Sequence, residues 1–281
     1  MESATQTKEK YIMINPSAEI ALILASLLFY ADFDESFNAT FSVGNGKAQI
    51  EVDQYGPFIT SGNKGKFGEA AEFIYEDKLE TIWTKDVVRY RAKGNFPYNH
   101  GEVFDGAIGM WLQIDMENLK ERSLIWLDPV HLLAESDRDN GKIWMDFVTS
   151  ELPDTPIFRF GTTGRRDLPG SRGGPNNEYV VTVPHIDFSG DSWHHVVGTW
   201  KNLNSSGKKG VIHVYFDGVL VGEVKGFDHT LDWNIDDWEI RIGLGFKGRI
   251  DDFFILDSFL SEETIQEVYR SGKSLGDFLE L

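Results

Sequence analysis

The chain has 281 residues, no cysteine and a formal net charge of −18. Such a strong negative charge repels nucleic acid, which excludes it as an expected partner, and attracts divalent cations. The absence of cysteine excludes disulfides, thiolate metal sites and cysteine nucleophiles. Hydrophobic residues make up 41% of the chain and charged residues 26%, which indicates a globular protein long enough for one large β domain or two small ones.

The N-terminal region contains one apolar run, "IALILASLLF", at residues 20–29. The run is too short to cross a bilayer, since a spanning helix needs about 20 residues, and no other stretch is a better candidate. Glu19 precedes it directly and no basic cluster does, so it is a poor signal peptide. We predict a first strand from Leu27 to Phe33. Residues 1–18 are interpreted as a tail, natural or left from cloning, and residues 19–281 as a single domain.

Several segments alternate between apolar and polar residues, which predicts β-strands. The clearest is "VIHVYFDGVLVGEV" at residues 211–224, where Asp-Gly separates two apolar runs and predicts a type I′ hairpin. "HLLAESDRDNGKIWMDFV" at residues 131–148 has the same design around Asn-Gly. Further strands are predicted at residues 106–115, 194–200 and 239–246. Many short strands with regular turns favour an all-β fold, an antiparallel two-sheet jelly-roll sandwich.

One helix is predicted late in the chain, in "LSEETIQEVYRSG" at residues 260–272. Ser261 is a good N-cap, and acidic residues follow in the first turn, where the helix dipole favours negative charge. Gly272 can close the helix in a left-handed conformation. The predicted domain is therefore a β-sandwich with one short C-terminal helix.

The C-terminal half resembles a known family. "DSWHHVVGTW", "VIHVYFDGVLVGEV" and "IRIGLGFKGRIDDFFILDSFLSEETIQEVYRSG" follow one another in the order found in laminin G-like jelly rolls of the concanavalin A-like lectin/glucanase superfamily. "LLFYADFDESFNATFSVGNGKA" looks like the opening strand of that family, and the resemblance covers residues 27–272. It implies two antiparallel sheets with the first and last strands close together. The fold is shared by lectins, adhesion modules, hydrolases and lyases, so it implies no single activity.

The resemblance also implies a calcium ion between the opening and closing strands. Two adjacent acids, Asp251 and Asp252, interrupt the apolar run "GRIDDFFIL". Because neighbours on a strand point to opposite faces, we expect Asp251 to point towards protein as a calcium ligand and Asp252 to face solvent. Asp32 and Asp34 are the expected partners, since carboxylates suit Ca²⁺. The alternative is that Asp251 caps a turn or accepts backbone N–H groups without a metal.

Candidate ligand-binding residues fall in the middle of the chain. Arg159, Arg165, Arg166 and Arg172 lie in a loop-like stretch with a local excess of positive charge, and arginine forks bind carboxylates, sulfates and phosphates. Alternatively they pair with neighbouring acids. Other candidates are an aromatic side chain that could stack on a sugar and a histidine that could line the concave face: Trp144 and His195.

The remaining motifs do not form a complete catalytic site. "ESDRD" at residues 135–139 resembles the E-x-D-x-E of family 16 glycoside hydrolases, but it ends in Asp and runs directly into the predicted hairpin turn. We therefore predict a non-catalytic module that binds a glycan or a protein and carries a structural calcium ion, secreted or at the cell surface as the resemblance implies. The alternative is a polysaccharide lyase or glycoside hydrolase of the same jelly-roll class, with Arg159 or Arg166 neutralising a uronate.

Overall fold

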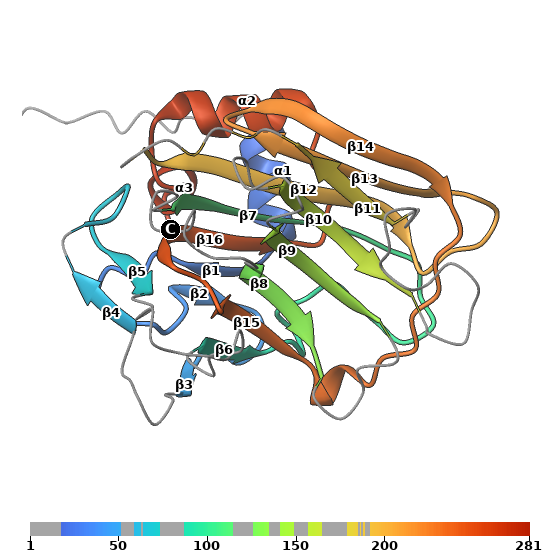
Figure 1. Ribbon diagram of the computed structural model, residues 1–281, viewed down its shortest axis with the longest axis horizontal. Helices are drawn as coiled ribbons and strands as arrows, with labels where there is room; N and C mark the ends of the chain where they lie inside the picture. The colour runs from blue at the N-terminus through green and yellow to red at the C-terminus, as the bar shows by residue number, and fades with distance from the viewer. Residues whose placement is uncertain are drawn as a thin grey trace, which may run out of the picture.

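The two predicted sheets are present and pack face to face as an antiparallel jelly-roll sandwich (Figure 1). The structure is a computed structural model, and it describes residues 18–51, 59–62, 64–73, 87–114, 126–134, 141–148, 157–164, 179–184, 186, 188 and 192–281.

The larger sheet has nine strands and contains both the opening and the closing strand. Its hydrogen-bonded order is β14-β13-β12-β7-β16-β1-β2, with β5 paired to β16 and β4 paired to β5. The strands are β1 Leu27–Ala31, β2 Phe41–Ser42, β4 Ile59–Gly62, β5 Ala70–Phe73, β7 Phe104–Gln113, β12 His194–Leu203, β13 Gly210–Phe216, β14 Val219–Phe227 and β16 Gly248–Leu256. β1 and β16 are antiparallel neighbours, so the first and last strands do lie side by side.

The smaller sheet has seven strands in the order β11-β10-β9-β8-β15-β6-β3. The strands are β3 Gln49–Glu51, β6 Val87–Arg91, β8 Trp126–Leu133, β9 Lys142–Val148, β10 Ile157–Thr163, β11 Val180–Val183 and β15 Glu239–Leu244. The hairpin of β13 and β14 is confirmed. β8 and β9 also pair as predicted, although Asn140 of their expected turn lies outside the described residues. In the hairpin of β13 and β14, Asp217 and Gly218 have φ of 50° and 78°, as a type I′ turn requires.

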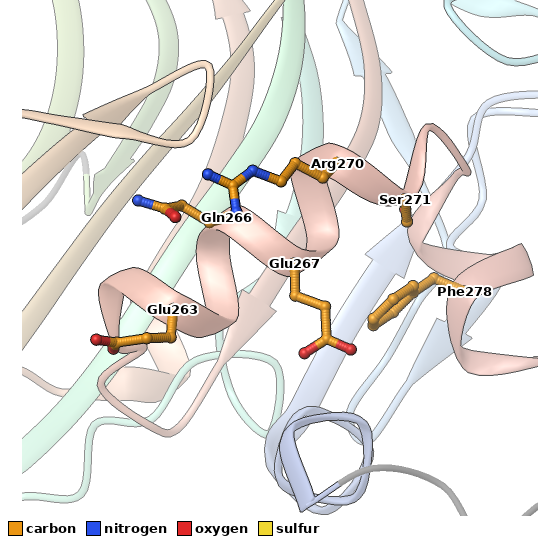
Figure 2. Close-up of a pocket in the computed structure, with 6 residues that line it drawn as sticks. All are labelled: Glu263, Gln266, Glu267, Arg270, Ser271 and Phe278. Carbon is orange, nitrogen blue, oxygen red and sulfur yellow. The ribbon is translucent and has the colours of Figure 1, made fainter.

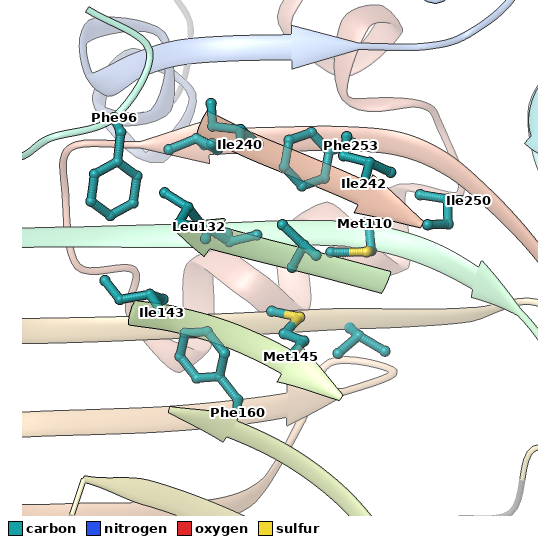
Figure 3. Packing of buried hydrophobic residues seen from close by; sticks show 14 of the residues in the cluster. Phe96, Met110, Leu132, Ile143, Met145, Phe160, Ile240, Ile242, Ile250 and Phe253 are labelled. Atoms are coloured by element: carbon teal, nitrogen blue, oxygen red, sulfur yellow. The ribbon is translucent and has the colours of Figure 1, made fainter. Parts of the chain in front are cut away.

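The main core lies between the sheets and is built from alternate residues of facing strands (Figure 3). Met110 and Phe253 of the nine-stranded sheet face Met145 and Ile242 of the seven-stranded sheet. Gly198 on β12 leaves space for Phe160, because a Cβ there would lie 2.5 Å from a carbon of that ring. The residues that alternate with these core positions therefore point to the outer face of each sheet, where they make other contacts.

Three helices cover the outer face of the nine-stranded sheet. They are α1 Ala18–Ser26, α2 Glu262–Ser271 and α3 Leu275–Leu279. Their apolar side chains, including Ile23, Ile265 and Leu279, form a second core with outward residues of the sheet. The predicted helix is confirmed together with its Ser261 N-cap and its left-handed Gly272. No helix among the described residues is long and apolar enough to span a membrane.

The expectation that Asp252 faces solvent is wrong. Asp251 and Asp252 are only 1% and 2% exposed. The register of β16 against β7 shifts between Asp251 and Phe254, and Asp252 has φ of 55°, so a β-bulge inserts one extra residue. The bulge turns both carboxylates to the outer face of the sheet, while Ile250 and Phe253 on either side point into the main core. That outer face is covered by helices, so both acids are buried.

Asp252 connects three separate segments of the chain. Its carboxylate accepts a hydrogen bond from the Tyr30 hydroxyl at 2.6 Å and from the backbone N–H of Leu275 at 2.9 Å. Burial raises the pKa of Asp251 to about 8 and the pKa of Asp252 to about 7, while these hydrogen bonds lower the latter. The last strand is thereby tied to the first strand and to the start of α3.

We predict that Asp252→Ala lowers the free energy of unfolding by about 3 kcal/mol, because it leaves two buried donors without an acceptor at about 1–3 kcal/mol each. Asp252→Asn is the matched control, since its amide oxygen still accepts and Asn tolerates positive φ, so its cost should be about 1 kcal/mol or less. Urea unfolding followed by tryptophan fluorescence measures both. A loss below about 1 kcal/mol for Asp252→Ala would show that the hydrogen bonds of Asp252 contribute little to stability.

Candidate functional site

The outer face of the seven-stranded sheet concentrates charged and aromatic side chains. On its central strands the residues that alternate with core positions are polar: on β9, for example, Ile143 and Met145 enter the core while Trp144 and Asp146 point the other way. We call this surface the polar sheet face. It consists of Arg89, Arg91, Asp128, His131, Lys142, Trp144, Asp146, Arg159, Glu239 and Arg241.

A buried histidine–aspartate pair lies on β8, near the middle of this face. The Nδ1 atom of His131 is 2.6 Å from a carboxylate oxygen of Asp128. A neutral imidazole that donates from Nδ1 keeps Nε2 as an acceptor, and the buried Nε2 of His131 has no hydrogen-bond partner among the described residues. Burial lowers the pKa of His131, against the hydrogen bond and charge of Asp128, which raise it. His131 is therefore a neutral ring with one unused acceptor.

A buried ion pair lies next to it, across β9 and β10. Asp146 and Arg159 are register partners, and the guanidinium binds the carboxylate in a fork, with Nε 2.8 Å from Oδ1 and Nη2 in contact with Oδ2. Burial raises the pKa of the Asp146 carboxyl, and the hydrogen bond and charge of Arg159 lower it. Such a pair is stable only with both partners, because removing one leaves a buried charge uncompensated.

The rest of the polar sheet face continues the same pattern of paired charge. The Lys142 ammonium lies over the Trp144 ring, 4.7 Å from its centroid, a cation–π contact. On β15, Arg241 donates to Glu239 from Nε at 3.1 Å and from Nη2 at 2.9 Å. Strand register places Arg241 beside His131, and His131 beside Trp144. The three side chains therefore form one row across neighbouring strands.

The predicted ligand-binding residues separate into two places. Arg159 and Trp144 are both on the polar sheet face, although Arg159 belongs to strand β10 rather than to a loop, and its acid pairing is the alternative weighed from the sequence. Trp144 is 4% exposed, so its ring offers no open stacking surface. Arg165, Arg166 and Arg172 lie outside the described residues, as does the acidic segment 135–139.

His195 is on the other sheet, beneath α2. Its ring lies 5.1 Å from Trp111 and is stacked on Tyr269 at 6.2 Å between ring centroids. Both ring nitrogens are buried and have no partner within the described part of the chain, and burial lowers the pKa of His195 to about 4. It therefore packs as a neutral ring under the helix, away from the polar sheet face.

The three predicted calcium ligands do not converge as three carboxylates. Asp34 accepts the N–H of Glu69 at 2.7 Å, and Asp251 accepts the N–H of Phe67 at 2.9 Å, so both bind one turn, residues 64–69. Asp32 instead accepts the N–H of Asp34 at 3.2 Å. The described part of the chain contains no group of three or more His, Cys, Asp or Glu residues that could hold a metal ion. The calcium site stays a prediction.

A second candidate place is an open hollow on the helical side of the molecule (Figure 2). It has a volume of about 520 Å³ and is lined by α2 and by Phe278 of α3. The other lining residues are Glu263, Gln266, Glu267, Arg270 and Ser271. The hollow contains none of the predicted site residues.

Sequence reasoning missed Asp128, His131 and Asp146 as site residues. The signal was present in the alternation of "KIWMDFV", which puts Lys142, Trp144 and Asp146 on one side of a strand and apolar residues on the other. What it did not contain was the pairing of strands that brings residues from β8, β9 and β10 together.

Comparison with known families supports the resemblance seen in the motifs. Residues 132–266 match the family model described as the concanavalin A-like lectin/glucanases superfamily. The match covers just under half of the chain. The matched segment begins within β8 and ends within α2, so it includes most of the polar sheet face. No curated protein matches the chain.

Solved structures share the jelly-roll fold at low sequence identity. The binding domain of botulinum neurotoxin serotype D has a TM-score of 0.57 at 15% identity, covering 90% of this chain and 53% of that chain. The serotype G binding domain has a TM-score of 0.55 at 9% identity, covering 87% and 51%. A serotype D ligand binding domain in complex with N-acetylneuraminic acid has 0.51 at 13% identity, covering 90% and 53%. This chain thus spans about half the length of these domains, and the likeness shows the fold.

The buried His195 predicts acid sensitivity. Its folded pKa of about 4 lies below its ordinary value, so its stabilising contribution is present above pH 6.5 and is lost as the pH falls towards 4. A shift of this size corresponds to up to about 3 kcal/mol. In His195→Leu this loss between pH 7 and pH 4.5 should disappear, with little change at pH 7, because the removed nitrogens had no partners. Urea unfolding at both pH values measures it, and an unchanged pH dependence would contradict the assignment.

Proposed function

We propose that this protein is a non-catalytic glycan-binding module whose ligand surface is the polar sheet face. The observation that carries the proposal is the Nε2 acceptor of His131, which has no partner among the described residues and stands in a row with Trp144 and Arg241. Because that atom is buried, a ligand hydroxyl would have to displace whatever covers it. A buried polar atom without a partner costs about 1–3 kcal/mol, and such exceptions in a native structure call for a ligand, a water or a function. Saccharides are dense in hydroxyl groups, which donate to an acceptor of this kind.

The surroundings of His131 support a binding role over a purely structural one. Asp128, Asp146 and Arg241 are also buried on this side of the sheet, although the side chains of the main core are on the other side. Buried charges stabilise a fold no better than apolar residues of the same shape, so their concentration here points to recognition. One similar structure, a toxin ligand binding domain, is in complex with N-acetylneuraminic acid, and this supports a sugar as the class of ligand.

A lyase is the second candidate, and the Asp128–His131 pair is the observation that favours it. A neutral histidine oriented by a carboxylate can act as a general base. In a uronate its Nε2 would take the C5 proton while the C4–O bond breaks, which forms a C4–C5 double bond. The polar sheet face contains no tyrosine among its described residues to protonate the leaving oxygen, so binding without catalysis is the better-supported function.

Glycan binding is tested with His131→Gln, measured by isothermal titration calorimetry against a panel of neutral and acidic oligosaccharides. The Gln amide still donates to Asp128 but cannot present the imidazole acceptor, so affinity should fall about tenfold, or about 1.4 kcal/mol. Lys273→Gln, an exposed residue between α2 and α3 on the other side of the sandwich, is the control and should bind as the unmodified protein does.

Binding to no saccharide, with a protein ligand found instead, would redirect the proposal to adhesion. New absorbance near 235 nm during incubation with a uronate polymer, absent in His131→Gln, would replace it with the lyase. Binding that is unchanged in His131→Gln would place the glycan elsewhere on the molecule.

We also propose that the turn at residues 64–69 binds the predicted Ca²⁺. Asp34 and Asp251 would supply carboxylates and the turn would supply carbonyl oxygens, which are hard ligands that calcium prefers. Gly68 supports the fit: it has φ of 65°, and a Cβ there would lie 2.2 Å from Asp34 Oδ1, so only glycine lets the turn come this close. Asp32 is two residues away. The ion would stabilise the link between the segment after β1 and β16.

Chelation should therefore lower the melting temperature of the protein, and Ca²⁺ at 100 times its Kd should stabilise it by about 2.7 kcal/mol. Differential scanning calorimetry with EDTA, Ca²⁺ and Mg²⁺ measures the effect. In Asp251→Asn the response to Ca²⁺ should be lost. A melting temperature that changes neither with chelator nor with added Ca²⁺ would contradict the calcium site. The turn would then be held by its backbone hydrogen bonds alone.

A further inference from the structure

The five inner strands of the polar sheet face carry more cations than acids, in a strongly negative protein. Every described charged residue on β6, β15, β8, β9 and β10 lies on this face. There are five cations and three acids, a local net charge of +2 (five minus three), whereas the whole chain carries −18. The cations are Arg89, Arg91, Lys142, Arg159 and Arg241, and the acids are Asp128, Asp146 and Glu239.

In two ion pairs of this face the cation is the more exposed partner. In the Arg159–Asp146 pair the arginine side chain is 29% exposed and the aspartate 4%. In the Arg91–Glu239 pair the arginine is 47% exposed and the glutamate 14%. In the Arg241–Glu239 pair the order is reversed, so a ligand meets positive charge at Arg159 and Arg91 rather than over the whole face.

Arg159 has hydrogen-bonding capacity left for a ligand. A guanidinium carries five N–H donors, and the fork to Asp146 uses one on Nε and one on Nη2. Within the part of the chain that the structure describes, no further bond of Arg159 is present. The remaining donors, including both on Nη1, match the paired oxygens of a carboxylate or a sulfate. Asp146 meanwhile holds the guanidinium in place, which reduces the entropy lost on binding.

The spare donors and the spare acceptor lie at a distance that suits a small saccharide. His131 is on β8 and Arg159 on β10, with β9 between them. Register places Arg159 two residues along from the level of His131, so their backbones are about 12 Å apart. An acidic sugar presents both required groups, a hydroxyl that can donate to Nε2 of His131 and an acid group that can bind Nη1 of Arg159. A neutral sugar presents only the first.

We infer that the ligand of the polar sheet face is an acidic saccharide, with its acid group bound by the free edge of the Arg159 guanidinium and a hydroxyl bound by His131. The inference rests on the proposed glycan-binding function and narrows it to a chemical class. It assigns to the Arg159–Asp146 pair a role as a fixed anion clamp, in addition to its place in the sheet.

The experiment compares saccharides that differ in charge alone. Digalacturonate and its methyl ester are the first pair, and a sulfated disaccharide and its unsulfated parent are the second, titrated at 150 mM salt. The acidic member should bind at least tenfold more tightly in one pair or both, with the carboxylated and sulfated arms identifying which acid group is preferred. The unmodified protein and the double variant Arg159→Gln/Asp146→Asn are tested in parallel.

The double variant avoids leaving a buried charge unpaired, because it replaces the ion pair with two amides that can still hydrogen-bond. It should keep the melting temperature within a few degrees and lose the preference for the acidic member. Lys273→Gln, an exposed cation lost from the helical side but outside the lining of the hollow, should keep that preference.

The outcomes separate the two proposals. Equal binding of charged and neutral members would overturn the acidic-ligand inference and leave the glycan-binding function standing. Binding of no saccharide at all would overturn both. A preference for the acidic member that persists in the folded double variant would overturn the assignment to Arg159.

Discussion

The bulge at Asp251 and Asp252 is the constraint on which the rest of the architecture depends. One extra residue in the last strand turns two adjacent carboxylates to the same side of the sheet. One of them holds the turn at residues 64–69, and the other holds Tyr30 of the first strand and the start of α3. Because the helices are fastened there, they cover the outer face of the nine-stranded sheet, and ligand recognition is left to the other sheet.

The polar sheet face follows from that division. A sheet with one face in the core must place the alternate residues of its strands on the opposite side, and in this chain those residues are charged. Charges in a poorly solvated place need partners, which explains why Asp146 is paired with Arg159 and Asp128 with His131. In each pair the carboxylate is hydrogen-bonded, while the basic partner keeps atoms that can still bond: N–H donors on Arg159 and the Nε2 acceptor on His131. These remaining atoms suit acidic and hydroxylated ligands.

The sequence alone was sufficient for features governed by local rules. The strands between 106 and 246, the Asp-Gly hairpin and the capped helix α2 depend on neighbouring residues, and all are confirmed. The exposure of Asp252 was mispredicted, because a bulge depends on pairing with β7 and on a positive φ that an Asp-Asp dipeptide does not reveal. Arg159 was assigned to a loop because its partner Asp146 is 13 residues away and is identified only by strand register.

The net charge of the chain and the local charge of the site together set what can bind. At physiological salt the screening length is about 8 Å, so a short acidic saccharide on the polar sheet face feels the +2 of its immediate surroundings more than the −18 of the whole. A long polyanion such as nucleic acid extends beyond this patch onto negative surface and is repelled there. The negative charge of the protein therefore favours a small acidic group at Arg159 over long polyanions, which a uniformly basic surface would also bind.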